Sequence, residues 1–108
     1  MSFAALAAAL AARLGPVSLP GRITEEWVAD VIAPFGDDVE LAAREALIAV
    51  QEEMVEATDL PWPEPFPDWG AGPPRPGVRA DGGTLLLWYG AEARPALELE
   101  PVRLDELE

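Results

Sequence analysis

The chain has 108 residues, half of them hydrophobic, which is typical of one folded domain with a modest core. It contains no Cys, His, Lys or Asn, and this excludes disulfides, the usual zinc ligands, thiol and histidine catalysis, and lysine-based phosphate or Schiff-base sites. Twenty acidic residues against seven arginines give a net charge of −13, which argues against binding to nucleic acid or anionic membranes and favours a basic protein partner.

The longest apolar run, from Phe3 to Ala12, bears on membrane insertion and targeting. It is about half of the roughly 20 residues that a transmembrane helix requires. The first basic residue of the chain, Arg13, follows the run, whereas a signal peptide carries positive charge ahead of its apolar region. We therefore expect a cytoplasmic protein with no membrane partner. With the usual ligand residues absent, we also expect no cofactor.

Residues 2–14 predict a helix, because Phe3, Leu6, Leu10 and Leu14 recur at helical spacing and form one stripe. Alanines occupy most of the other positions, so the helix can approach its neighbours closely. We favour a core helix. The alternative is a homodimer formed through the alanine-rich face, which carries almost no charge.

Two further helices are expected. Thr24 is the predicted N-cap of a helix that ends near Ala33. Asp37 is predicted to open the longest helix, over about residues 38–58, with Glu40 three positions later as in a capping box. The longest helix has two apolar stripes, which indicates that it is contacted from two sides and is the central element.

Residues 60–77, called the strap below, contain seven prolines and three glycines, which predicts an extended connection. Trp62, Phe66 and Trp69 are interleaved with these prolines. Aromatic rings on a stiff backbone lose little freedom on docking, so the three are candidate partner-binding residues. The alternative, which we favour for the group, is that the rings fold back onto the helices and sheet. Trp69 is the best single candidate for a partner contact, because glycines follow it.

The C-terminal part is predicted to be β-structure. Two runs, 78–81 and 84–89, flank Gly82-Gly83, which indicates an antiparallel hairpin. The second run is apolar on both faces, so we expect helices to cover one of them. Residues 97–100 predict a half-exposed third strand, and the acidic tail 102–108 is expected to fray.

These elements predict an α+β fold in which three helices pack on a small three-stranded antiparallel sheet, joined by the proline-rich strap. We expect a single domain over residues 1–108. Its helical part is 1–59, its connection is 60–77, and its hairpin, third strand and acidic tail occupy 78–108.

A group of glutamates on the longest helix is the clearest chemical cluster. Glu52 and Glu56 are one turn apart, so both carboxylates can point toward a hard cation such as Mg²⁺. The spelling Glu52-Glu53-x-x-Glu56 resembles the first half of the metal motif of all-α nucleotide pyrophosphohydrolases, and this resemblance implies a magnesium-dependent hydrolase. That family's second half is an ExxD on a following helix, whereas this chain enters the proline-rich strap. We therefore favour a solvated acidic face and expect no metal site.

The distribution of charge suggests a further hypothesis, an acidic mimic of DNA. Residues 37–60 hold eight acidic residues and one arginine, a net charge of −7. A helical segment of that length is about 36 Å long and so carries one net charge per roughly 5 Å. Duplex DNA carries one per about 1.7 Å, so the mimicry is sparse.

No acid–base pair for catalysis can be singled out in the sequence. The sequence therefore favours a non-enzymatic interaction or accessory module, such as an inhibitor or immunity-type protein. The hydrolase and the DNA mimic are the alternatives.

Overall fold

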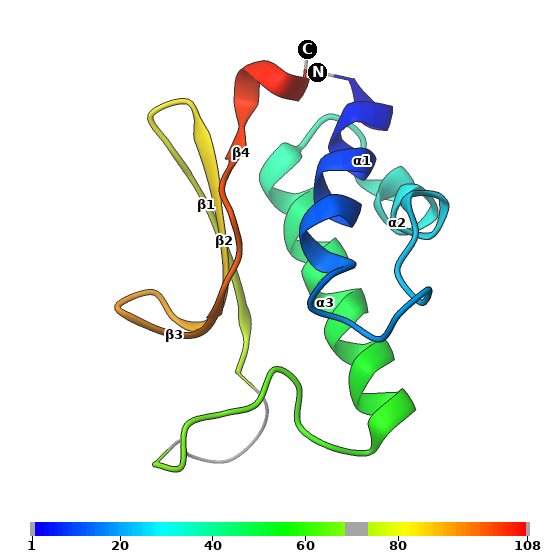
Figure 1. The fold of residues 1–108 in the computed structure, drawn as a ribbon. Helices are drawn as coiled ribbons and strands as arrows, with labels where there is room; N and C mark the ends of the chain where they lie inside the picture. Colours follow the sequence, from blue (N-terminus) through cyan, green and yellow to red (C-terminus); the bar gives the residue numbers. More distant parts are fainter. Residues whose placement is uncertain (1, 69–73, 108) are drawn as a thin grey trace.

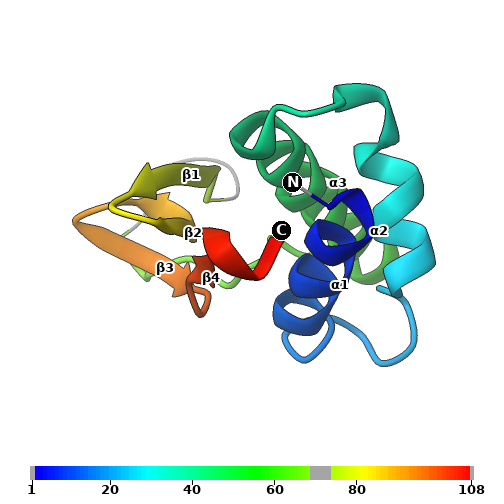
Figure 2. The same cartoon turned by 90° about the horizontal axis from the view of Figure 1, so that it is seen from above.

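The computed structural model describes residues 2–68 and 74–107, and it confirms the predicted α+β class. Three helices form one layer, and an antiparallel sheet of three main strands with a short fourth forms the other (Figure 1). Seen from above, the three helices lie on the same side of the sheet (Figure 2). One face of the sheet is therefore covered by none of the described helices.

The helical layer contains the elements α1 (Phe3–Leu14), α2 (Glu25–Ile32), the 3-10 turn η1 (Ala33–Phe35) and α3 (Val39–Thr58). Each α-helix begins after a residue whose side chain accepts a hydrogen bond from a backbone N–H of the first turn. These N-caps are Ser2, Thr24 and Asp38. Each cap satisfies one of the N–H groups that the start of a helix leaves unpaired. The predicted cap at Thr24 is thus confirmed.

The sheet layer contains the strands β1 (Pro76–Asp81), β2 (Thr84–Ala91), β3 (Arg94–Glu98) and β4 (Val102–Arg103), followed by the 3-10 turn η2 (Leu104–Leu107). β2 is central, with β1 along one edge and β3 and β4 along the other, all antiparallel to it. Gly82 and Gly83 form the tight turn between β1 and β2. Their φ angles of 53° and 88° are accessible to glycine without strain, and the predicted hairpin is confirmed.

The predicted start of α3 is wrong by one residue. Asp38, not Asp37, is the N-cap, and its carboxylate accepts the Leu41 N–H at 3.0 Å. Glu40 does not act as in a capping box. Its carboxylate instead accepts the backbone N–H of Ala80, on β1, at 2.9 Å. Glu40 therefore joins α3 to the edge of the sheet, a role that depends on a residue forty positions away.

The C-terminal segment also differs from the prediction. The third strand begins at Arg94, earlier than expected, and the chain after Pro101 returns to β2 as β4. The tail does not fray over 102–107, because Val102 and Leu107 are buried. The backbone N–H of Ser2 donates to the carbonyl of Leu107, and the two ends of the chain lie side by side in both views (Figures 1 and 2). Two apolar anchors thus hold a segment that also carries two adjacent acidic residues, Asp105 and Glu106.

The core fills the space between the two layers, and α3 contacts both the other helices and β1, as predicted for a central element. Tyr89 of β2 is fully buried, and its hydroxyl donates to the carbonyl of Leu47 on α3 at 2.7 Å. Burial raises the pKa of the Tyr89 hydroxyl far above its usual value. Tyr89 is therefore part of the packed core. No charged side chain in the described part of the chain is buried.

Candidate functional site

Alternate residues of β2 point to opposite faces of the sheet. Leu85, Leu87 and Tyr89 point toward the helices and are buried, whereas Leu86 and Trp88 point away and are half-buried. We call the outward side, away from the helices in Figure 2, the open face. One face of an antiparallel sheet is often solvated and polar. A leucine and a tryptophan adjacent on such a face are more typical of a contact surface.

A pocket of about 160 Å³ lies on the open face. Its walls come from β2, β3 and the segments that follow them, and include Leu86, Trp88, Glu92, Pro95, Glu98 and Pro101. Mainly apolar walls with a few polar groups are the usual composition of a binding pocket. Small-molecule sites generally begin at roughly 300 Å³. The volume therefore suits one side chain of a partner better than a cofactor or a whole substrate.

Trp88 is held in place by two contacts. Its ring rests against Gly77 of β1, where a Cβ atom would come within 2.3 Å of the ring. Its indole N–H donates to the carbonyl of Gly90 at 3.1 Å. The position of the ring thus requires glycine at 77, and this wall of the pocket is organised before any ligand binds.

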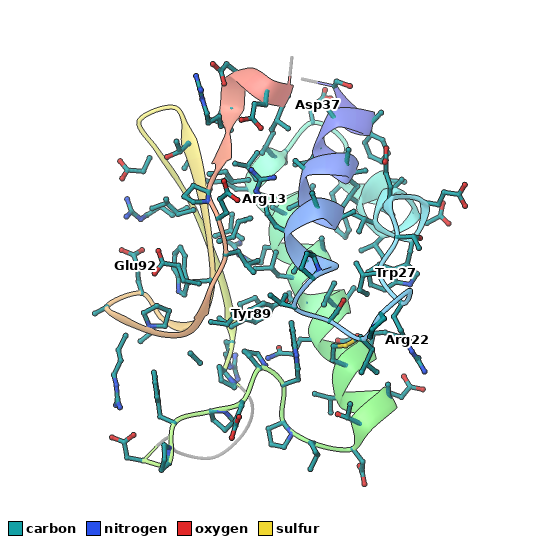
Figure 3. All side chains as sticks on the ribbon, viewed as in Figure 1. Arg13, Arg22, Trp27, Asp37, Tyr89 and Glu92 are labelled. Atoms are coloured by element: carbon teal, nitrogen blue, oxygen red, sulfur yellow. The ribbon has the colours of Figure 1, made fainter. Side chains whose placement is uncertain are left out.

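The two carboxylates of the pocket have different surroundings. Glu92 accepts two hydrogen bonds from Arg79 of β1, at 2.9 and 3.3 Å, and hydrogen bonding to Glu92 is the main reason that the pKa of the Arg79 guanidinium is raised. Figure 3 shows Glu92 on the side of the sheet opposite to Tyr89 and the helices. Glu98 lies opposite Trp88 in the β2–β3 ladder. It forms no ion pair with any residue in the described ranges.

Trp62, the first of the predicted partner-binding residues, packs against the core. Its ring meets Tyr89 edge-on, with 5.1 Å between the ring centroids and 75° between the planes. Its carbonyl accepts a hydrogen bond of 3.0 Å from the Gln51 side chain, which also donates to the carbonyl of Pro74. Gln51 of α3 therefore ties both ends of the strap to the helix layer. A partner contact at Trp62 stays a prediction.

Phe66, the second predicted residue, is half-buried and lies beneath a cation. The Arg94 guanidinium of β3 is 4.0 Å from the centre of the Phe66 ring, and it also pairs with Asp68 at 3.1 Å. The hydrogen bond from Arg94 lowers the pKa of the Asp68 carboxyl. Trp69, the third predicted residue, lies outside the described residues. For both residues, too, binding to a partner stays a prediction.

The glutamates of the pyrophosphohydrolase-like motif are not brought together with further ligands. Glu52 and Glu56 are exposed on α3, and Glu53 pairs with Arg22 at 2.8 Å. Within residues 2–68 and 74–107, no three carboxylates are arranged so that they could hold a metal ion. The described residues therefore do not supply the second ligand-bearing element that the resemblance requires.

The N-terminal helix α1 is a core element, as its leucine stripe predicted. Its three leucines are fully buried. The guanidinium of Arg13 donates to the carbonyls of Glu100 and Pro101 at 2.9 and 3.0 Å, so α1 also touches the C-terminal segment. Phe3 remains 37% exposed, beside a shallow groove between α1 and α2. The homodimer through this helix stays a prediction.

Sequence reasoning missed the site on the open face. The available signal was the run at 84–89, which is apolar on both sides. That pattern alone does not say which side the helices cover, so it could not single out Leu86 and Trp88. Glu98 could not be singled out either, because its place opposite Trp88 depends on strand register.

No family model, curated protein or solved structure matches this chain. Among the described residues, no helix combines the length and apolar character needed to cross a membrane. The function is therefore inferred from the geometry and charge of the chain itself.

Proposed function

We propose that this protein is a non-enzymatic interaction module that binds a basic protein partner through the open face of its sheet. The observation that carries the proposal is the pocket between Leu86, Trp88 and Pro95, on a face that none of the described helices covers. Burial of such an apolar surface is the main favourable contribution to most protein–protein association. A partner segment lying across the open face would bury both half-exposed side chains of β2.

The charge of the protein supports a basic partner. Four of its seven arginines, at positions 22, 79, 94 and 103, already pair with carboxylates of the same chain. With twenty acidic residues in total, most carboxylates are left to face solvent or a partner. A surplus of one sign speeds encounter with a partner of the opposite sign and disfavours partners of the same sign. An inhibitor or immunity-type protein with a basic target has these properties.

The strap is the competing surface for the same function. Trp62 and Phe66 have contacts within the chain, but these contacts do not test whether either residue, or Trp69, also meets a partner. A useful experiment therefore compares the open face with the strap directly.

Site-specific photo-crosslinking makes this comparison. Benzoylphenylalanine is placed singly at three exposed positions: Arg103 on the open face, Glu64 in the strap, and Glu56 on the exposed side of α3 as the control. Each variant is expressed in the source organism and irradiated, and its products are separated and identified by mass spectrometry. We expect one discrete, basic crosslinked protein from position 103 and little from position 56.

The pattern of products decides between the surfaces. A discrete product from position 64 alone would move the interface to the strap. Equal products from all three positions would indicate diffuse attraction to an acidic surface, and absence of any product would contradict an interaction module. Circular dichroism of each variant checks that the probe has not altered the fold.

A further inference from the structure

We propose that the pocket on the open face receives an arginine side chain of the partner, with the guanidinium held by Trp88 and Glu98. This inference rests on the proposed function and adds the chemical group that the site recognises. Three features support it: the position of Glu98, the residues that form the pocket walls, and a similar arrangement elsewhere in the same molecule.

Glu98 is the carboxylate that remains available. It lies directly opposite Trp88 in the antiparallel ladder, and side chains opposite one another on one face are about 5 Å apart at Cβ. Glu92, the other carboxylate of the pocket, is already engaged by two hydrogen bonds from Arg79. An incoming cation therefore finds an aromatic ring and one unpaired carboxylate adjacent to each other.

The walls of the pocket favour arginine over lysine or an apolar side chain. A guanidinium is planar, stacks on aromatic rings and can donate two parallel hydrogen bonds to a carboxylate. It is also more weakly hydrated than an ammonium group, so less hydration is lost when it enters a pocket walled by Leu86 and Pro95. A purely apolar side chain would leave the Glu98 carboxylate partly desolvated and without a partner, which disfavours binding.

The protein contains the same combination within its own chain. Arg94 lies over the ring of Phe66 at 4.0 Å while its guanidinium pairs with Asp68 at 3.1 Å. That arrangement of arginine, aromatic ring and carboxylate is the one that we infer for the pocket. There, Trp88 would supply the aromatic ring and Glu98 the carboxylate. Tryptophan is the strongest of the aromatic rings in such contacts.

The test uses a pair of small probes that differ in charge but hardly in shape. At 11.6 kDa, the protein is well suited to amide and indole chemical-shift mapping by NMR. It is titrated with Nα-acetyl-arginine methylamide and, separately, with Nα-acetyl-citrulline methylamide. We expect the arginine probe to shift the resonances of the Trp88 indole and of Leu86 and Glu98, and the citrulline probe to shift them little.

Matched variants locate the effect. Glu98→Gln removes the carboxylate from the pocket, and Glu52→Gln makes the same change on the exposed face of α3. We expect Glu98→Gln to weaken binding of the arginine probe by about two- to fivefold, the range for an exposed ion pair. Glu52→Gln should leave it unchanged. The amide spectrum of each variant is recorded without probe as a control. A spectrum that changes only near the substituted residue shows that the fold is retained.

Each adverse outcome has a distinct meaning. Equal shifts with both probes, or shifts spread evenly over acidic residues of α3, would overturn recognition of arginine in this pocket. If Nα-acetyl-leucine methylamide shifts the same resonances while the arginine probe does not, the arginine proposal fails but the open face remains a docking surface. Failure of the crosslinking experiment described above would instead remove the docking surface itself.

Discussion

The two faces of the sheet are built from the same strand and nearly the same kinds of residues, yet they differ in burial. On the inner face, Leu85, Leu87 and Tyr89 are at most 1% exposed beneath the helices. On the open face, Leu86 and Trp88 are half-buried and border a pocket. The difference lies in what covers each face, since both have large apolar side chains.

This difference separates stability from recognition. Free energy of folding comes from surface removed from water within the chain, so the inner face contributes most of it. The open face keeps part of its apolar surface for later burial against a partner. Substitutions on the inner face should therefore lower stability, whereas those on the open face should mainly weaken binding to a partner.

The largest effect is expected from the inner face. Leu87→Ala should lower the free energy of unfolding by about 2–5 kcal/mol, because it leaves a cavity in the core. Leu86→Ala, its neighbour on the open face, should cost about 1–2 kcal/mol, since part of that side chain is already in water. Urea unfolding followed by circular dichroism measures both. Equal losses would mean that the open face is also covered, for example by a second copy of the chain.

A second comparison concerns the two aromatic residues of the strap that the structure describes. Trp62→Ala removes the contact with Tyr89 and should destabilise the protein by about 2–4 kcal/mol. Phe66→Ala removes the contact with Arg94 from a side chain that is only half-buried, and it should cost less, about 1 kcal/mol. Thermal unfolding distinguishes the two. A large loss for Phe66→Ala would place that ring in the core layer after all.

Trp69→Ala tests the remaining partner-binding prediction in the strap. If the partner binds through the strap, this substitution should weaken the interaction with the crosslinked partner at an unchanged melting temperature, whereas binding through the open face predicts an unchanged interaction. A lowered melting temperature with unchanged partner binding would contradict the prediction.

A smaller effect is expected for the buried hydroxyl of the inner face. Tyr89→Phe removes the hydrogen bond to Leu47 and should cost about 1 kcal/mol near neutral pH. The pKa of Tyr89 is raised by burial, so the folded protein keeps the proton that the unfolded chain loses near pH 10. The stability that this provides is complete below about pH 10 and declines as the pH rises further. Urea unfolding between pH 8 and 11 should show this decline in the wild type and a weaker one in Tyr89→Phe.

No measurable effect is expected from magnesium. Calorimetric titration with Mg²⁺ or Mn²⁺ should give no binding tighter than about millimolar, because exposed carboxylates on one helix face hold a hard cation poorly. A micromolar site that is lost in Glu52→Gln or Glu56→Gln would revive the hydrolase hypothesis and contradict the proposed function.

The sequence predicted the elements wherever their signals are local. The cap at Thr24, the glycine pair of the hairpin and the leucine stripe of α1 all depend on residues within a few positions of one another. An error arose where a residue distant in the sequence binds a side chain that local spacing had assigned to a helix cap. Glu40 had the spacing of a capping box, but its carboxylate accepts the N–H of Ala80 instead.

The candidate site was decided by tertiary structure alone. A run that is apolar on both sides shows that β2 has two faces suited to burial, but the choice of face depends on where three helices dock. The pocket requires the ring of Trp88 to rest on Gly77 and the β3 register to bring Glu98 opposite it. Likewise, Val102 and Leu107 anchor an acidic tail only because β2 and α1 lie within reach. Local patterns determine which surfaces can be buried, whereas long-range packing selects which of them are left open to a partner.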